Sequence, residues 1–273
     1  MLEILKIVLK WKKQVLFFTI IAAIVSIIIT MPFIMPPYYK SISKFYLSNP
    51  SSTDRSALFN EKEVAGVNMF GGKEDINRFL TILNSAPVNL AVIQKYNLGK
   101  HYKIDAGNPE LFMYYTQKEF YNNFNAVRND LGAIEVSVVD TDNKLAAQIV
   151  KDVVSISDSI YRTILVENKS TVIELLNKQI ADKNVELAKV ASATISDDIK
   201  KLVAIRDQYA VSSSKDFKTI FIVEEPSPAV KKTKPVRWLI LLASTIAAFV
   251  LASLVALLLE LYKHADKYGF QRS

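Results

Sequence analysis

The chain has 273 residues, half of them hydrophobic, no cysteine, and a formal net charge of +7. The charge is concentrated near the ends: residues 1–14 carry +3, residues 231–237 carry +4 and residues 260–273 carry +1, which leaves −1 for residues 15–230. Because the positive charge flanks apolar runs, it suits anionic lipid headgroups, and nucleic acid is not expected as a partner.

Two uncharged apolar runs, at residues 15–35 and 238–259, predict transmembrane helices. Each is long enough for a helix to cross about 30 Å of hydrocarbon, which takes roughly 20 residues. A cleavable signal peptide is the alternative for the first run, because lysines precede it. However, the run is longer than a signal sequence requires and ends in prolines, with no small-residue cleavage site. A retained first span is therefore expected, with residues 36–237 on one side of the membrane.

The lysine-rich segment 1–14 predicts the orientation, since cytoplasmic flanks carry an excess of basic residues. The main domain, residues 36–237, is then extracytoplasmic, and the tail 260–273 is cytoplasmic like the amino terminus. The second span disagrees in part, because its flank at 231–237 is more basic than its tail. Since the first helix usually dominates, we expect a two-pass protein of the bacterial inner (plasma) membrane with a periplasmic domain.

Three segments of the main domain have the alternation and β-branched content of strands: residues 39–47, 133–139 and 217–223. Residues 50–72, with Pro50 and several glycines, predict a loop or short helix. These strands predict a small α/β base, in which short helices cover a sheet.

Short helices are predicted at residues 76–84 and 87–96, the second capped by Ser85 and ended by Asn97 and Gly99. Another helix begins at Asn108-Pro109. Its aromatic residues are expected in the core: Phe112, Tyr115, Phe120 and Phe124.

A long helical stalk is predicted from about residue 143 to 210, because neither Gly nor Pro occurs between Ala133 and Glu225. With Asp142 as its cap, a helix from 143 to about 190 would extend on the order of 70 Å. The composition of residues 194–198 predicts a turn, followed by a returning helix to about Tyr209. One unbroken helix is the alternative. The fold class is thus α+β, with two membrane anchors, a small base and a protruding stalk.

Apolar residues recur on one face of the predicted stalk, and this face needs a covering partner. Neighbouring copies of the chain are one partner, since the spacing mixes steps of three and four as in a coiled coil. The chain's own shorter helices are the other. The predicted assembly face consists of Leu145, Ile149, Val153, Ile156, Ile160 and Ile164, and the stripe resumes at Val172, Leu176, Ile180 and Leu187.

Small residues four positions apart form one narrow face of the second span: Ser244, Ala248, Ala252 and Ala256. Such a face lets helices approach closely in lipid. Ala22 and Ser26 have the same spacing in the first span, which makes that span the expected partner.

No arrangement of residues points to catalysis, a cofactor or a metal. The two histidines, His101 and His264, have no cysteine or second histidine nearby in the sequence, so each is interpreted as a lone exposed residue. Residues 71–73 (Gly-Gly-Lys) lack the spacing and the Ser or Thr of a phosphate loop. The acidic pairs at 197–198 and 224–225 are adjacent, so their side chains point apart. A membrane-bound hydrolase is therefore not favoured.

Several motifs of the chain point together to one known family. One is the strand that opens with Tyr39 and Ser41 directly after the first span. Others are the helices at 77–98 and the strand Ile134–Asp140, which precedes an alanine-containing helix. Most specific is the strand 217–225 followed by a proline-rich segment with Pro226, Pro228 and Pro235. With these motifs the chain resembles the Wzz family of chain-length determinants, also called polysaccharide co-polymerases, and the likeness covers essentially the whole chain.

This resemblance implies a non-enzymatic inner-membrane protein whose periplasmic domains form a homo-oligomeric ring. With a membrane polymerase, the ring sets the length of a surface glycan, such as lipopolysaccharide O-antigen or capsule, that is built on a lipid carrier. The three prolines are hypothesised to affect product length, because they hold the chain extended where it re-enters the bilayer. The stalk is shorter than in O-antigen members and the proline spacing is stretched, which leaves the glycan and its length open.

Two alternatives remain, a kinase activator within the resemblance and a ligand sensor from a different class. Relatives in capsule systems activate a separate tyrosine kinase through a cytoplasmic tail, but the tail here has 14 residues and no tyrosine cluster. An extracytoplasmic ligand sensor would need an output domain after the second span, and 14 residues are too few to form one.

Overall fold

A computed structural model describes residues 7, 9–49, 70–190, 192–213 and 218–269. The chain forms two compact units. The membrane unit combines Met1–Tyr39 with Lys231–Ser273, and the middle unit is Lys40–Val230. The loop expected before Gly71 and the start of the strand expected from Phe217 fall largely outside the described residues.

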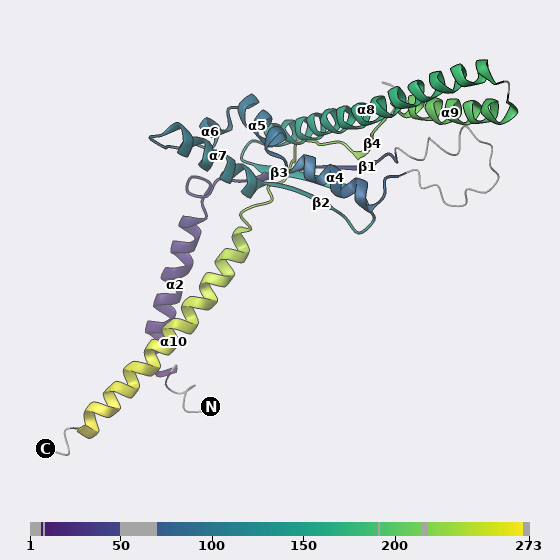
Figure 1. Ribbon diagram of the computed structural model, residues 1–273. Coiled ribbons are helices and arrows are strands. Elements are labelled where there is room, and N and C mark those ends of the chain that lie inside the picture. Colours follow the sequence, from purple (N-terminus) through teal and green to yellow (C-terminus); the bar gives the residue numbers. More distant parts are fainter. Residues whose placement is uncertain (1–6, 8, 50–69, 191, 214–217, 270–273) are drawn as a thin grey trace. The chain divides into compact units, whose positions relative to one another are not determined.

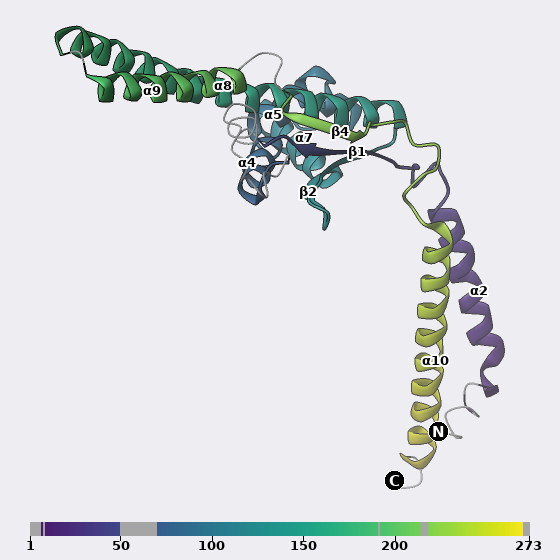
Figure 2. The ribbon, with the colours of Figure 1, turned by 90° about the vertical axis from the view of Figure 1, so that its right-hand side faces the viewer.

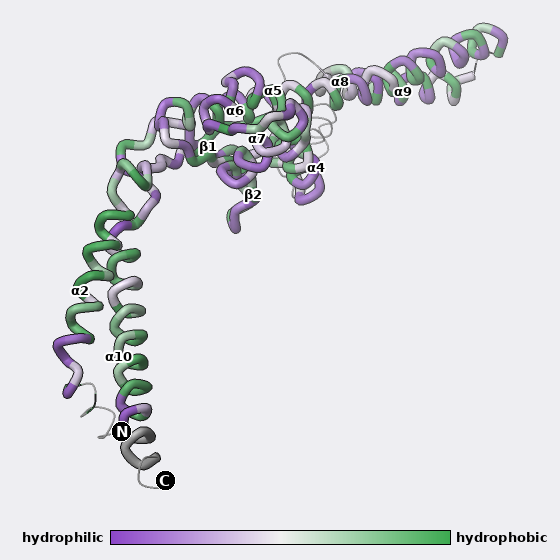
Figure 3. The backbone as a smooth tube through the Cα atoms, turned by 90° about the vertical axis from the view of Figure 1, so that its left-hand side faces the viewer, coloured by the Kyte–Doolittle hydropathy of each residue, from purple (hydrophilic) through white to green (hydrophobic). Residues whose placement is uncertain are grey.

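The membrane unit contains two long apolar helices, α2 (Lys12–Ile29) and α10 (Arg237–Gly269), which lie side by side in Figures 1 and 2. Both are long and apolar enough to cross a membrane, the second over Arg237–Lys263, and Figure 3 shows them in mostly hydrophobic colours. The first helix ends at Ile29 rather than Met35, and turns follow. Pro32 explains this early end, since proline disfavours helical geometry in the residue before it.

The middle unit has a four-stranded sheet in the order β2-β3-β1-β4. Strand β1 (Tyr39–Leu47) has the predicted bounds, and β3 (Ile134–Asp140) and β4 (Ile220–Glu224) lie where strands were expected. Strand β2 (Phe124–Arg128) was not predicted. It pairs with β3 in an antiparallel hairpin, and Gly132 has the positive φ of 84° that the hairpin turn requires.

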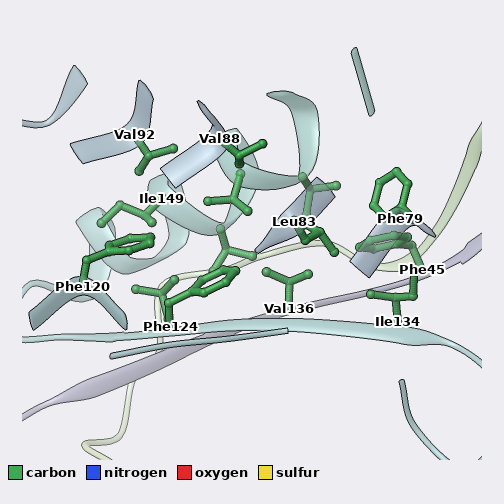
Figure 4. Packing of buried hydrophobic residues seen from close by; sticks show 14 of the residues in the cluster. Phe45, Phe79, Leu83, Val88, Val92, Phe120, Phe124, Ile134, Val136 and Ile149 are labelled. Carbon is green, nitrogen blue, oxygen red and sulfur yellow. The ribbon is translucent and has the colours of Figure 1, made fainter. Parts of the chain in front are cut away.

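Short helices pack on this sheet, and the core of the middle unit lies between the two layers. They are α4 (Lys73–Leu83), α5 (Ala86–Lys95), α6 (Leu98–His101) and α7 (Pro109–Asn123). As predicted, α5 begins after Ser85, and Asn97 behind it is left-handed, with φ 48°. Helices α4 and α5 are bent by 42° relative to each other, and only when joined are they long and apolar enough to cross a membrane. Their apolar side chains are buried among the strands and helices of Figure 4.

The expectation for the aromatic residues after Pro109 is only partly confirmed. Phe120 and Phe124 are buried and stack with ring centroids 5.3 Å apart. Phe124, however, ends the helix and opens β2. Tyr115 was wrongly assigned to the core: it is 44% exposed, because its position on α7 turns it away from the sheet.

Helix α8 (Asn143–Lys189) confirms the predicted long helix, and the Asp142 carboxylate caps it by accepting hydrogen bonds from the Lys144 and Leu145 amides. Helix α9 (Ala193–Ser212) returns alongside it in Figures 1 and 2, so the single unbroken helix is wrong. The turn comes earlier than predicted, near Val190, and Thr194 already lies inside α9.

Candidate functional site

The motif residues of the middle unit meet where β1 passes the proline-rich segment after β4. Ser41 Oγ donates a hydrogen bond to the Ser227 carbonyl at 3.0 Å, and Ser43 Oγ donates to the Glu224 carbonyl at 3.1 Å. Both serines are buried. Because Pro226 and Pro228 have no N–H, they cannot extend the ladder of strand β4. Beyond the end of β4, the Ser41 side chain provides such a link instead.

The first turn of α8 holds the same segment from a second direction. Asn143 Nδ2 donates to the Ala229 carbonyl at 3.0 Å. We call Ser41, Ser43, Asn143 and the carbonyls they bind the junction. It connects the proline-rich segment both to the central strand of the sheet and to the base of the long helix.

Asp140 and His101 stabilise the strand-to-helix turn beside the junction. Asp140 is buried, and its Oδ1 lies 2.7 Å from His101 Nε2 and accepts the Asp142 amide at 2.8 Å. The interpretation of His101 as a lone exposed residue is therefore wrong, because the turn after β3 brings a buried carboxylate against its ring. The side chain of His264 lies outside the described residues.

In the membrane unit, the segments that end α2 and begin α10 are joined by backbone hydrogen bonds. The Tyr38 amide donates to the Lys234 carbonyl at 2.9 Å, and the Thr233 amide donates to the Tyr38 carbonyl at 2.7 Å. Tyr39 follows as the first residue of β1, and Pro235 comes directly after the bridged Lys234. The motif thus coincides with a backbone pairing between two segments about 200 residues apart in the sequence.

The predicted assembly face of the stalk needs correction. Ile149 and Val153 are fully buried in the chain's own core, so no neighbouring copy can cover them. The other predicted positions are partly buried against the core, except Ile164, whose side chain is 42% exposed. The alternative, burial against the chain's own elements, holds for this part of the face. The partly buried positions packed against the core are Leu145, Ile156 and Ile160.

The small-residue face of the second span lies on the covered side of α10. Ala256 is buried, and the other three positions, Ser244, Ala248 and Ala252, are half-buried, whereas Ala247 on the opposite side is exposed. On α2, the covered positions include Ala22 and Ser26. Because α2 and α10 pack together, this face is used between the two spans of one chain.

A buried carboxylate, Glu260, holds the other end of the helix pair. It is 6% exposed, accepts a hydrogen bond from Trp11 Nε1 at 3.0 Å, and forms an ion pair with Lys10. The Lys263 ammonium lies 4.7 Å from the centroid of the Trp11 ring. Since a carboxylate in an apolar surrounding is costly unless it is paired, these contacts fix how α2 aligns with α10.

The described residues include no group of three or more His, Cys, Asp or Glu side chains that could hold a metal ion. At the Gly-Gly-Lys sequence, the Asp75 carboxylate accepts the Gly72 amide at 3.0 Å and occupies the helix start where a phosphate would bind. At least one member of each acidic pair is likewise engaged, since Asp198 contacts Lys183 at 3.2 Å and Glu224 contacts Lys44 at 2.9 Å. This Glu224 contact also raises the pKa of Lys44.

Residues 1–96 match the Wzz family model, described as chain length determinant protein. The predicted resemblance is thereby confirmed over the first third of the chain, which includes α2, β1, α4 and α5. A full-length bacterial polysaccharide co-polymerase is structurally similar, with TM-score 0.43 and 10% identity over 97% of this chain and 98% of that one. A fragment of WzzB, a polysaccharide co-polymerase from Salmonella Typhimurium, has TM-score 0.41 and 13% identity over 72% and 99%. No curated protein matches the chain.

Sequence reasoning found Ser41 and the prolines but missed the polar residues that bind around them. Asn143 looked like an ordinary first residue of a helix, and its bond to Ala229 depends on the tertiary fold. The role of Glu260 could have been predicted from the sequence. It is the first charged residue after a run of 22 uncharged ones, and such a carboxylate requires a partner.

Proposed function

We propose that this chain regulates the length of a surface polysaccharide without catalysing its synthesis. The match of residues 1–96 to the chain-length determinant family carries the proposal. Two apolar helices suited to spanning a membrane are consistent with it, as is the engagement of Asp198 and Glu224 in structural contacts. The family description names no glycan, so O-antigen, capsule and related polymers remain within the proposal.

In this proposal the protein lies in the bacterial inner membrane with both termini in the cytoplasm and the middle unit in the periplasm. The lysines of residues 1–14 support this orientation through the positive-inside rule. A membrane polymerase and its lipid-linked polysaccharide then act on the same side as the middle unit.

We further propose that copies of the chain assemble into a ring through the outer part of the hairpin α8–α9. Four apolar side chains there are 39–61% exposed: Leu175, Val185, Val190 and Ile205. Apolar surface of this kind on an extracytoplasmic domain favours burial against another protein surface. A ring offers each copy the same neighbour on either side.

We also propose that the junction couples the membrane helices to the long helix. Its hydrogen bonds hold the proline-rich segment to both β1 and α8. Replacing Pro226, Pro228 and Pro235 with Ala should loosen this segment and shift the modal polysaccharide length. Pro109→Ala is the matched control, because Pro109 starts α7 and takes no part in the junction. An unaltered modal polysaccharide length in the triple variant would show that these prolines have no coupling role.

The test of the function compares the size distribution of surface polysaccharide, resolved on a gel, between a deletion strain and the same strain complemented with the intact gene. Length regulation predicts a modal ladder that collapses to short or random lengths in the deletion and returns on complementation. Unchanged lengths in normal amount would contradict it. Loss of polymer together with loss of protein tyrosine phosphorylation would instead identify a kinase activator.

A further inference from the structure

A cavity of about 580 Å³ lies in the membrane unit where α2 ends and α10 begins. Two segments line this open cavity, and the backbone pairing of Tyr38 with Lys234 holds them together. Most of its wall is apolar. The lining side chains used below are Ile34, Met35, Tyr38, Lys234, Leu239 and Ile240.

This end of the helix pair has features of a membrane interface. Phe33 is 97% exposed and Trp238 is 67% exposed, although both are large aromatic side chains. Aromatic residues concentrate at the level of lipid headgroups, where one side is apolar and the other is wet. The cavity therefore opens at the depth where a lipid headgroup and the upper part of its acyl chains meet.

Four cations occur in and just before the first turn of α10, and one of them, Lys234, lines the cavity: Lys231, Lys232, Lys234 and Arg237. No acidic residue occurs between Glu225 and Glu260 to balance them in sequence. Within the part of the chain that the structure describes, none of the four forms an ion pair, and the buried Nε of Arg237 has no hydrogen-bond partner. The other basic segment, at Lys12 and Lys13, lies at the opposite end of α2, so the helix pair is positively charged at both ends.

We propose that this cavity binds an anionic phospholipid of the bilayer. The phosphate contacts Lys234 and Arg237, and the hydrocarbon lies against Ile34, Met35, Leu239 and Ile240. Charge complementarity selects the occupant, since an uncharged lipid or a neighbouring apolar helix would leave four cations unpaired at the interface. Basic side chains near a membrane each strengthen attraction to anionic lipid. This site goes beyond length regulation, and its test does not depend on that function.

The experiment uses the full-length chain purified in a neutral detergent and titrated with phosphatidylglycerol. Phosphatidylcholine with the same acyl chains is the neutral reference. Native mass spectrometry counts the lipids retained by each chain. We expect selective retention of phosphatidylglycerol and about tenfold weaker binding after Lys234→Gln with Arg237→Gln, because two attractive charges are lost. Lys234→Arg keeps the charge and should keep the binding.

Two further variants separate this site from general charge attraction. Lys12→Gln with Lys13→Gln removes the same charge at the opposite end of α2 and should change retention by less than about twofold. Ile240→Trp fills the cavity without changing charge and should weaken retention. Equal loss in both double glutamine variants would overturn the proposal. Equal retention of phosphatidylcholine, or displacement of the lipid by millimolar inorganic phosphate, would also overturn it.

Discussion

The two halves of α8 share the absence of helix-breaking residues but have different surroundings. From Asn143 to Tyr161 many side chains of the helix are buried against the sheet and the short helices. From Arg162 to Lys189 only Lys169 and Leu176 are buried. Both halves lack Gly and Pro and form regular helix. The comparison teaches that local propensity sets the length of α8, while burial in the core of the middle unit stabilises mainly its first half.

Truncation of a buried side chain should give the largest difference in stability between the two halves. Ile149→Ala opens a cavity in the core and should lower the free energy of unfolding by about 2–5 kcal/mol. The matched variant Ile180→Ala removes the same atoms from a half-buried site in the outer half and should cost less than about 1.5 kcal/mol. Denaturant unfolding of the full chain in detergent, followed by hydrogen exchange in α8 peptides, measures both. Equal losses would mean that the outer half is packed as well as the inner.

Tyr161 marks the end of the packed half and should make its stability sensitive to alkaline pH. Burial raises the pKa of its phenol to about 12, above the ordinary value of 10. The folded state then holds the proton more tightly than the unfolded state. This stabilisation is present below pH 10 and is lost as the pH rises through 12, by up to about 2–3 kcal/mol. Unfolding of Tyr161→Phe should lack this component between pH 10 and 12, and identical pH profiles would exclude it.

The helix cap tests whether the packed half depends on its first turn. Asp142→Ala removes the acceptor for the Lys144 and Leu145 amides and should cost about 1 kcal/mol. Hydrogen exchange should speed up in the first turn of α8 and leave the outer half unchanged. Asp182→Ala, an exposed change within the outer half, is the control. Faster exchange throughout α8 would show that the two halves unfold together.

The smallest effect should come from the ion pair that links the outer half of α8 to α9. Lys183 and Asp198 are partly exposed and 3.2 Å apart, so a double-mutant cycle with Lys183→Gln and Asp198→Asn should give about 0.2–1 kcal/mol. Added salt should reduce this coupling. A larger, salt-insensitive value would indicate that this region is more enclosed than the isolated chain suggests.

The sequence predicted those features that depend on local pattern. Strand β1, the cap at Asp142 and the length of α8 follow from alternation, capping chemistry and the absence of helix breakers. It did not predict β2, because Phe124 continues the aromatic spacing of α7 and only the hairpin with β3 makes it a strand. It placed the turn after α8 late, because Thr194 has the composition of a cap but lies inside α9.

The candidate site was likewise predicted only in part. Tyr39, Ser41 and the prolines were recognised as a motif, yet the reason for their proximity is visible only in the fold. Ser41 and Ser227 are 186 positions apart, and His101 and Asp140 are 39 apart. Contacts over such separations leave no periodic pattern, so sequence patterning alone does not reveal them.

The central claim is that this chain sets polymer length without making the polymer. The most direct measurement determines the modal length and the total mass of surface polysaccharide together, in a deletion strain with graded expression of the intact gene. The account predicts that the modal length is restored with expression, while synthesis continues at zero expression. Polymer that disappears entirely without the protein, and then returns in proportion to expression with no change in length distribution, would contradict it.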